Sequence, residues 1–571
     1  MSNNSNSVKE SQEPPPPPLS ASPPSSEMWN ERRESSHHRG LTSSVAGIVR
    51  EGRTHKEYEY SLVPTNDTET VRDGSNEPED NRQQSEERQL FLISTDIDRR
   101  NYQRYLGPDM TEKGSRVTQY AASCAGNLSV FAGGVVMAWS SPILPMLKKD
   151  PPLSDNPLGR PINEEEGSWI GSLLAAGAAI GGFGAGYLTE KFGRKNALLF
   201  SAAPFILGWI LVATAGNIAQ LYIARIFFGM GVGIAYTALP MYVGEIAETS
   251  IRGALGSLMQ LFISGGLIYG YVIGPYVSYL AFWIVCACVP VAFVFVFITM
   301  PESPHYFISR GRKEDAMKSL ARLRGKTVNG VQQEVDEIQM TVEEAYRNQG
   351  SFMSLFRVRA NSKALMLTSA LVAFQQFTGI NIVLFYTGDI FNSTGTALSS
   401  AISTIIVGCV MLIASCGTPI FVDRLGRKIL LIISGIGQAA TLIALGLFFY
   451  LKDVSKSDVS NLGWLPVTSL VIFIAAYSIG WGPLPWAVMG ELFASDVKSR
   501  ASSITVVFCW VLAFCITKFF TNIESALGTY TAFWIFAGFC IASVVFTIFL
   551  LPETKGKSLK EIQDILNGYV K

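Results

Sequence analysis

The chain has 571 residues, of which 48% are hydrophobic and 16% are charged, and its mean hydropathy is +0.26. Soluble globular proteins carry roughly 25% charged residues, so this composition excludes an ordinary soluble multidomain protein and favours a membrane protein. Lys and Arg total 46, as do Asp and Glu, so the formal net charge is zero. The sequence has no basic stripe interleaved with aromatic residues, so nucleic-acid binding is not expected.

The first 115 residues differ in composition from the rest of the chain. Five consecutive prolines, Pro14–Pro18, and an acidic stretch over 66–87 offer too little apolar surface to offset the entropy of an ordered chain. We therefore predict that 1–115 is a disordered tail. The sequence near Met1 has no apolar segment of the kind found in signal peptides, so we expect no cleaved signal peptide. The sequence Tyr60-Ser61-Leu62-Val63 has the form of a tyrosine-based sorting signal, which makes trafficking proteins possible partners of the tail.

From residue 117 onward, apolar segments recur that are each about twenty residues long, enough to cross a hydrocarbon core of ~30 Å as a helix. We predict twelve membrane spans, so the lipid bilayer is a partner. The predicted spans are 117–140, 167–188, 197–215, 220–243, 253–275, 280–299, 363–389, 397–420, 429–451, 464–488, 500–522 and 528–551. Because twelve is even, both termini lie on the same side of the membrane.

The short loops predict the orientation of the spans. The turns Glu190–Lys195 and Asp423–Lys428 are rich in Lys and Arg, as is the segment after Pro552, whereas the connections at 216–219, 276–279 and 390–396 contain neither. By the positive-inside rule the first group is cytoplasmic, which places both termini in the cytoplasm. Asn392, in an Asn-Ser-Thr sequon, then becomes a candidate glycosylation site on the outer side.

The longest loop lies between the sixth and seventh spans and has a charged, helix-favouring composition. The expected fold is an all-α membrane protein of two six-helix halves joined by a cytoplasmic helical linker. The predicted parts after the tail are an N-terminal half over 116–300, the linker over 301–362, a C-terminal half over 363–551 and a cytoplasmic tail over 552–571.

The two halves carry matching sequence motifs. Residues 186–195 read GYLTEKFGRK and residues 419–428 read PIFVDRLGRK, with charges and glycine at the same positions. Pro301-Glu302-Ser303 ends the sixth span, and Pro552-Glu553-Thr554 ends the twelfth. This pattern indicates an internal duplication. Parallel six-span repeats that hold a solute between them near the bilayer midplane are a known architecture of secondary transporters.

Over residues 115–565 the order and spacing of several motifs resemble the sugar porter branch of the major facilitator superfamily. The motifs are Glu190–Lys195, Asp423–Lys428, Arg225 with Gly229, Gly231 and Gly233, Pro240–Glu245, Pro301–Pro304, Gln375–Asn381, Gly482–Trp486 and Pro552–Gly556. The long polar tail and the second half are most similar to insect trehalose facilitators. The resemblance implies the major facilitator fold and transport of trehalose or a related sugar. The alternatives are a glucose or hexose facilitator and a sugar sensor that does not transport.

Uncharged polar side chains within the spans are the candidate substrate ligands. A sugar hydroxyl needs a donor and an acceptor, and an amide supplies both without the cost of burying a charge in the bilayer. The candidates are Gln260, Gln375, Gln376 and Asn381. Gln375 to Asn381 covers about 600° of helix, so these amides share one face only if the helix is irregular near Gly379. Hydrogen bonds between helices are the alternative role, and the family resemblance favours substrate contact.

The tenth span is predicted to be broken. Pro483 and Pro485 remove helical hydrogen bonds, and Gly480 and Gly482 loosen the turn. Trp486, beside this break, offers an aromatic face to a sugar ring and is the fifth candidate ligand. Its alternative role is that of a tryptophan at the membrane interface.

The chain departs from the glucose-carrier pattern at four positions. The resemblance places a polar side chain of those carriers at each of Met411, Ser478, Cys509 and Ala513. One neutral hydrogen bond contributes roughly 0.5–1.5 kcal/mol net, so the loss of several partners would change the preferred sugar.

Charged residues at the inner ends of the spans are predicted to act as gates. They are Glu190, Arg194, Glu245 and Arg252 in the first half and Asp423, Arg427, Glu491 and Lys498 in the second. We predict ion pairs where the halves meet on the inside, which rocking of the halves would break. The alternative is that they only set topology. Arg225, near the outer end of the fourth span, is predicted to be structural or gating.

The sequence predicts a passive carrier of the plasma membrane rather than a proton symporter or an enzyme. The resemblance implies a first-span aspartate in proton symporters, and here Phe131–Val135 contains no carboxylate. The eight cysteines lie in apolar stretches without metal-ligand spacing, and no nucleophile–base pair is apparent. We expect no cofactor and no metal.

Overall fold

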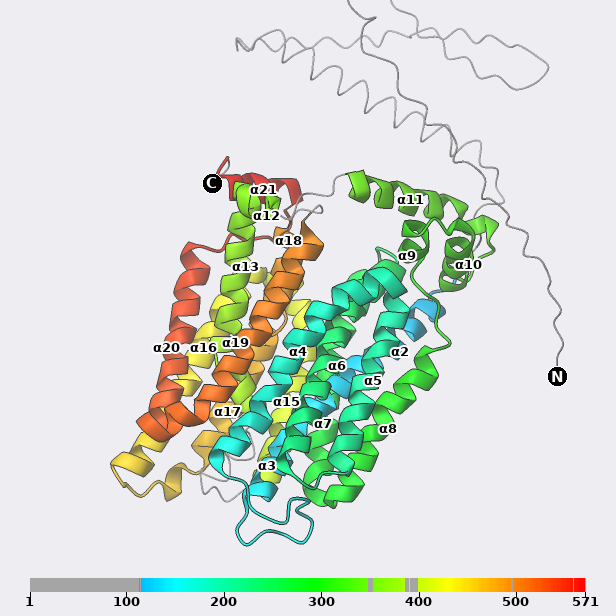
Figure 1. The fold of residues 1–571 in the computed structure, drawn as a ribbon. Coiled ribbons are helices and arrows are strands. Elements are labelled where there is room, and N and C mark those ends of the chain that lie inside the picture. The colour runs from blue at the N-terminus through cyan, green and yellow to red at the C-terminus, as the bar shows by residue number, and fades with distance from the viewer. Residues whose placement is uncertain are drawn as a thin grey trace, which may run out of the picture. The chain divides into compact units, whose positions relative to one another are not determined.

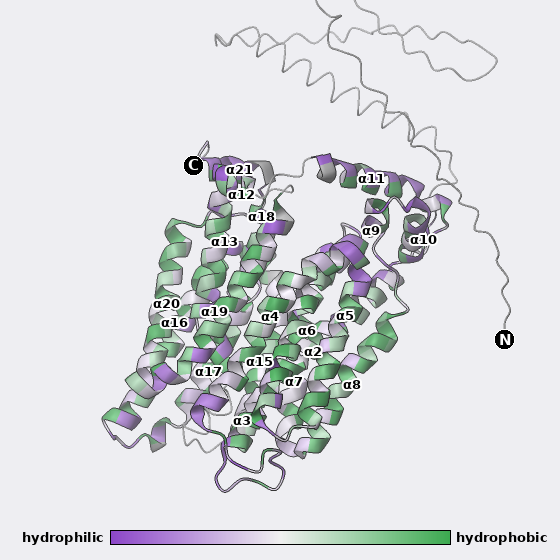
Figure 2. Ribbon diagram, viewed as in Figure 1, coloured by the Kyte–Doolittle hydropathy of each residue, from purple (hydrophilic) through white to green (hydrophobic). Residues whose placement is uncertain are grey.

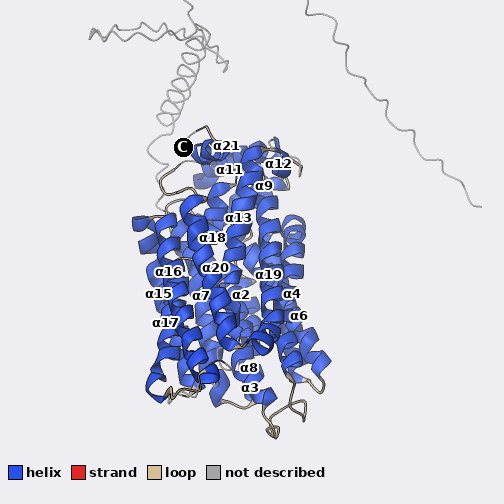
Figure 3. Cartoon of the chain, turned by 90° about the vertical axis from the view of Figure 1, so that its left-hand side faces the viewer, coloured by secondary structure: helices blue, strands red, loops and turns tan. Residues whose placement is uncertain are grey.

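The structure is a computed structural model that describes residues 112, 114–347, 353–385, 390, 399–493, 497–557 and 559–569. All regular secondary structure of the described residues is helical (Figures 1 and 3). Nearly all of the predicted tail over 1–115 lies outside the described residues, and so do the sorting-signal sequence and Asn392.

Twelve helical segments among the described residues are long and apolar enough to cross a membrane, and they confirm the predicted spans in number and order. The first half is formed by α2 (Val117–Ala138), α3 (Ser140–Lys148), α4 (Glu164–Phe192), α5 (Arg194–Ala213), α6 (Ile218–Ile246), α7 (Arg252–Ile273) and α8 (Tyr279–Phe297). The second half is formed by α13 (Arg359–Phe377), α15 (Ser400–Leu425), α16 (Arg427–Phe449), α17 (Trp464–Ile479), α18 (Leu484–Leu492), α19 (Lys498–Leu527) and α20 (Thr529–Phe549). Figure 2 shows their hydrophobic lengths, with hydrophilic residues gathered at the ends.

The boundaries of these helices follow from local chemistry. Asn163 and Asn217 begin α4 and α6 with reciprocal capping boxes, in which the side-chain oxygen accepts a backbone N–H three residues later. Gly193 and Gly426 separate α4 from α5 and α15 from α16 with φ of 96° and 87°, a conformation that L side chains rarely adopt. This requirement explains why both copies of the repeated motif contain a glycine.

Small residues allow helices of the first half to approach closely. A Cβ placed on Gly177 or Gly181 of α4 would lie 2.2 Å from a backbone oxygen of α6, and one on Gly229 of α6 would lie 2.1 Å from a backbone oxygen of α4. Helices in lipid associate through such close van der Waals packing, because lipid provides no hydrophobic driving force between them. The glycines therefore fix the α4–α6 pair as a rigid element.

Among the described helices, the two halves meet mainly where α4 packs on α19 and α7 packs on α15. On α7 the Tyr271 hydroxyl donates to the carbonyl oxygen of Leu384 at 2.8 Å, and Ser264 lies 3.4 Å from Ser415 Oγ. A site between the halves is therefore bordered by α4, α7, α15 and α19.

Short helices lie between the halves in sequence and at one end of the bundle (Figure 1). They are α9 (Pro304–Ser309), α10 (Lys313–Arg324), α11 (Gln332–Arg347) and α12 (Ser354–Arg357). Leu320, Val331 and Val335 form the small core between α10 and α11. The C-terminal helix α21 (Leu559–Asn567) lies at the same end, where Gln563 donates to the carbonyl oxygen of Leu492 at 2.8 Å.

Candidate substrate-binding site

Gln375 holds the break in the tenth span. α17 ends at Ile479 and α18 begins at Leu484, so the span is interrupted where the sequence predicted. Gln375 of α13 donates its amide N–H groups to the carbonyl oxygens of Trp481 at 2.7 Å and Gly482 at 2.9 Å. In a helix the carbonyl of Trp481 would accept from residue 485, but Pro485 has no N–H. Gln375 supplies the missing donor and couples α13 to the break.

Gln376 and Asn381 form an amide pair through an irregularity in the seventh span. α13 ends at Phe377, and Gly379 follows with a φ of 80°. This bend brings the Asn381 amide to Gln376 Oε1, while Gln376 Nε2 donates to Cys509 Sγ of α19 at 3.0 Å. Gln376 and Asn381 lie together because the helix is interrupted at Gly379. An irregular helix near Gly379 is what the sequence required for amides of this segment to share one face.

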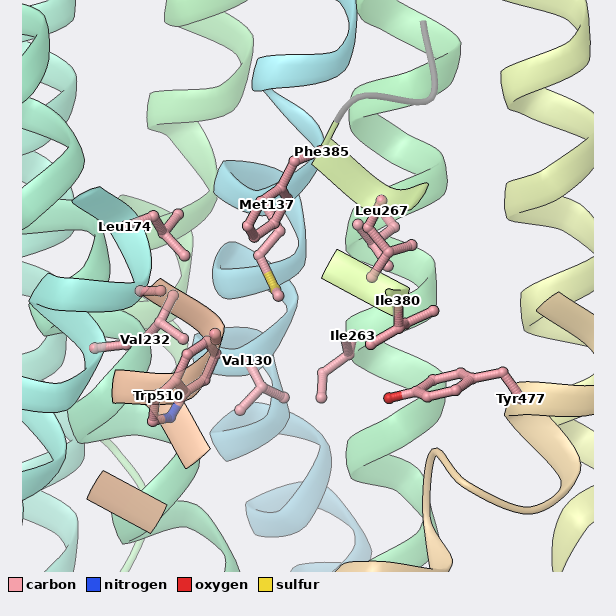
Figure 4. Close-up of a cluster of buried hydrophobic side chains, with 14 of the residues drawn as sticks. Val130, Met137, Leu174, Val232, Ile263, Leu267, Ile380, Phe385, Tyr477 and Trp510 are labelled. Carbon is pink, nitrogen blue, oxygen red and sulfur yellow. The ribbon is translucent and has the colours of Figure 1, made fainter. Parts of the chain in front are cut away.

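Gln260 of α7 is half-buried, and its side chain makes no hydrogen bond to any other residue that the structure describes. It precedes Ile263 by three residues and Leu267 by seven, so the three share one face of the helix. Figure 4 shows Ile263 and Leu267 in a cluster of buried hydrophobic side chains that also includes Tyr477 and Trp510 of the second half. The Gln260 amide is therefore available to bind a solute on the face of α7 that carries Ile263 and Leu267.

Aromatic residues of the second half complete the surroundings. Trp486 on α18 is partly buried against the core. Trp481, which the sequence reading overlooked, is fully buried within the break and donates Nε1–H to the carbonyl oxygen of Leu431 at 3.1 Å. Its position between Gly480 and Gly482 was the available signal. Tyr477 directs its hydroxyl toward Ile263 of the other half (Figure 4).

The four positions that depart from the glucose-carrier pattern are all buried. Their exposed fractions are 3% for Met411, 1% for Ser478, 2% for Cys509 and 0% for Ala513. The Ser478 hydroxyl donates to the carbonyl oxygen of Ile474 at 2.8 Å. Cys509 accepts from Gln376, so it fixes a candidate ligand.

The charged motif of the first half forms a network within that half. Arg194 pairs with Glu245 at 2.9 Å, and Ser303 Oγ donates to the same carboxylate. Glu302 accepts the backbone N–H groups of Arg194 at 3.0 Å and Lys195 at 2.9 Å, at the N-terminus of α5. Burial raises the pKa of Glu302, against the lowering effect of these N–H groups.

The second half repeats this network. Arg427 pairs with Glu491 at 2.9 Å, and Glu553 accepts the backbone N–H groups of Arg427 at 3.1 Å and Lys428 at 3.0 Å. Burial opposes ionisation of Glu553, but backbone N–H donors outweigh it and lower its pKa. Glu302 and Glu553, which the sequence reading used only as marks of duplication, stabilise the starts of α5 and α16.

The sequence predicted that the charged motifs at the end of the bundle near the linker helices pair between the two halves. The described residues of these motifs instead form their ion pairs within each half. Arg194–Glu245 and Arg427–Glu491 each lie within one half, because a turn and a helix end of the same half place them together. Arg252 donates to the carbonyl oxygen of Ala247 at 3.4 Å, and Glu190 is exposed. The side chains of Asp423 and Lys498 lie outside the described part of the chain.

Arg225 fastens three helices of the first half. It is fully buried and donates Nε–H to the carbonyl oxygen of Ile170 at 2.7 Å and Nη1–H to that of Val136 at 2.8 Å. Its guanidinium also lies 5.6 Å from the ring centroid of Trp139. These contacts join α6 to α4 and to the end of α2, which is a structural role.

A bundle in which the described residues form twelve membrane-length helices, with buried amides beside a broken helix in its second half, defines a polytopic transporter of the major facilitator fold. Residues 123–566 match the family described as "Sugar (and other) transporter", and the chain belongs to this family.

Relatives in this family include insect transporters. The chain is 38% identical to "Facilitated trehalose transporter Tret1" of Culex quinquefasciatus, over 80% of this chain and 87% of the relative. The protein of that name from Aedes aegypti is 37% identical, and the match spans 80% of this chain but only 56% of that longer relative. Among solved structures, the proton:xylose symporter XylE bound to 6-bromo-6-deoxy-D-glucose is 25% identical with a TM-score of 0.65, covering 79% of this chain and 99% of that one.

Proposed function

We propose that this protein is a facilitative carrier that moves trehalose or a related sugar across the plasma membrane by alternating access. The observation that carries the proposal is the group of amides at the interrupted seventh and tenth spans. Gln376 and Asn381 present donors and acceptors to a hydroxylated solute, and Gln260 of the other half is proposed to add a third amide. Trp486 provides an aromatic ring that suits a sugar face. Gln375 positions the break, since its N–H groups are committed to backbone carbonyls.

The departures from the glucose-carrier pattern argue against glucose as the preferred sugar. Met411, Cys509 and Ala513 leave buried, weakly polar or apolar surface where those carriers are expected to bind hydroxyls. A site with fewer polar groups binds its substrate weakly, which suits a carrier that must release it. A Kd of 1 mM requires only about 4 kcal/mol of binding free energy.

The carrier is proposed to be a uniporter. The helix α2 contains no Asp or Glu between Val117 and Ala138. A proton-coupled carrier needs a group that titrates as the solute site changes sides, and an ionisable residue deep in a span is the usual solution. The related xylose symporter couples to protons by its description, so coupling is the property in which this chain is proposed to differ.

Both termini and the linker helices are proposed to be cytoplasmic, with Asn392 on the outer side. The ion pairs inside each half then lie at the cytoplasmic end, where they keep each half rigid. Rigid halves allow the molecule to rock as two bodies around the solute.

A competition panel tests the substrate. Purified protein in liposomes takes up labelled trehalose while unlabelled trehalose, glucose or xylose is added in excess. The proposal expects trehalose to compete best. Competition by glucose alone would assign the protein to the hexose facilitators, and binding without any uptake would make it a sensor.

A further inference from the structure

Lys518 of α19 is a charged residue within a membrane-length helix, and only 7% of it is exposed. Its Nζ lies 2.7 Å from Glu165 Oε1 and 2.8 Å from Ser168 Oγ, both on α4. The same ammonium lies 4.5 Å from the ring centroid of Trp169. A buried ammonium ion is costly in a membrane unless it is paired, and Lys518 has an ion pair, a hydrogen bond and an aromatic face.

This cluster joins the two halves of the protein. α4 belongs to the first half and α19 to the second, and Glu165 and Lys518 are 353 positions apart. The Arg194–Glu245 and Arg427–Glu491 pairs instead each lie within one half. A pair within a half is preserved when the halves rock, whereas the Lys518–Glu165 pair has to break when they separate at this point.

The cluster lies at the end of the bundle opposite the linker helices. α4 begins beside Glu165 and ends at Phe192, next to the turn whose backbone binds Glu302. The first turn of α4 is therefore at the outer end under the proposed topology. Phe514, one turn before Lys518 on α19, lies against Trp169 with ring centroids 6.3 Å apart, so the contact extends inward from the ion pair.

We propose that Lys518, with Glu165, Ser168 and Trp169, is an outer latch that closes the path between the halves and must open before the solute site can face outward. The inference rests on the proposed alternating-access function. The latch is reversible because the Glu165 side chain is 59% exposed, so water replaces each partner as they part. Trp169 also donates Nε1–H to Glu165 at 3.1 Å, which keeps the carboxylate placed on α4 for reclosure.

The test measures access from the outer side directly. Ser172 lies one turn deeper on α4 than Ser168, on the same face, and is fully buried. A membrane-impermeant maleimide is added at the face opposite the linker helices, and its rate of reaction with the Ser172→Cys protein reports how often this face opens. The labelling of cysteines in the parent protein is measured separately and subtracted. Glu165→Gln and Lys518→Met should each raise the labelling rate about fivefold or more, as expected for loss of a coupling contact.

A neighbouring pair provides the matched control. Glu164 pairs with Lys148 at 2.8 Å, and both residues belong to the first half. Glu164→Gln should leave the labelling rate of Ser172→Cys unchanged. Exchanging the charges, by Glu165→Lys with Lys518→Glu, should bring the rate back toward that of the parent.

Two outcomes would overturn the latch. One is an unchanged labelling rate in folded Glu165→Gln protein, a variant that alters only an exposed side chain and so remains informative even if Lys518→Met does not fold. The other is an equal rise in Glu164→Gln. The labelling assay uses no sugar, so it is independent of transport. If Glu165→Gln raises the labelling rate but the protein takes up no sugar, the proposed transport function is refuted and the latch is still supported.

Discussion

Replacing Gln375 by leucine removes the donor that holds the break in the tenth span. The change keeps the size of the side chain but leaves the carbonyl oxygens of Trp481 and Gly482 without their amide donor. Water has little access, because Gln375 is only 2% exposed and Trp481 is fully buried. The consequence should therefore be a loss of stability before a loss of sugar affinity.

The magnitude follows from the number of stranded groups. A buried polar group without a partner costs roughly 1–3 kcal/mol, so two carbonyls cost about 2–6 kcal/mol if the break does not rearrange. Domains are stable by about 5–15 kcal/mol, so this is a large share. Gln376→Leu is the control at the adjacent position: its amide donates to a thiol and accepts from Asn381, so its removal strands no carbonyl and leaves one amide N–H without its partner.

The assay is thermal unfolding of the purified variants in detergent, followed by the fraction that remains monodisperse after heating. We expect Gln375→Leu to melt well below the parent and below Gln376→Leu. A Gln375→Leu protein that melts like the parent but transports with a greatly raised KM would refute this structural role. That result would mean that Gln375 binds the sugar directly and that the break is held by other contacts.

Two further predictions concern other parts of the protein. Gln260→Ala or Gln376→Ala should reduce sugar uptake at least tenfold at normal surface expression, since removing an amide removes a donor and an acceptor for a hydroxyl; unchanged uptake in both would exclude them as ligands. Glu553→Gln should lower the melting temperature at neutral pH more than Glu302→Gln. Folding lowers the pKa of Glu553, so its ionised carboxylate stabilises the folded state at pH values above the ordinary pKa of a glutamate; folding raises the pKa of Glu302, so its carboxylate gives no such stabilisation. The difference should begin to narrow as the pH falls below about 4.3, the ordinary pKa of a glutamate, and should disappear only once the pH is below the lowered pKa of folded Glu553. Equal melting temperatures at neutral pH would contradict the prediction.

The sequence predicted features that depend on local chemistry. Apolar length gave the twelve spans, and prolines beside glycines gave the break before Leu484. The angular spacing from Gln375 to Asn381 meant that amides could share one face only if the helix is irregular near Gly379, where φ is 80° and Asn381 reaches Gln376. Each prediction concerned neighbours within a few residues of one another, for which helix geometry is sufficient.

Contacts between distant residues were not predicted. The sequence does not indicate that Lys518 meets Glu165, because the pair depends on how α4 and α19 cross. For the same reason the inner arginines were assigned to the interface between halves, although they bind carboxylates of their own half. The repeated Pro-Glu-Ser/Thr motif marked duplication, but its role at a helix N-terminus appears only when Glu302 is placed beside Arg194.

Tracer uptake of labelled trehalose into liposomes that contain only this protein is the most direct test of passive sugar transport. For a passive carrier, the internal concentration of trehalose should rise to equal the external concentration and stop there. Acidifying the outside should add no accumulation and no inward current, since α2 carries no carboxylate. Accumulation above the external concentration under a proton gradient would rule out passive transport and make the protein a symporter.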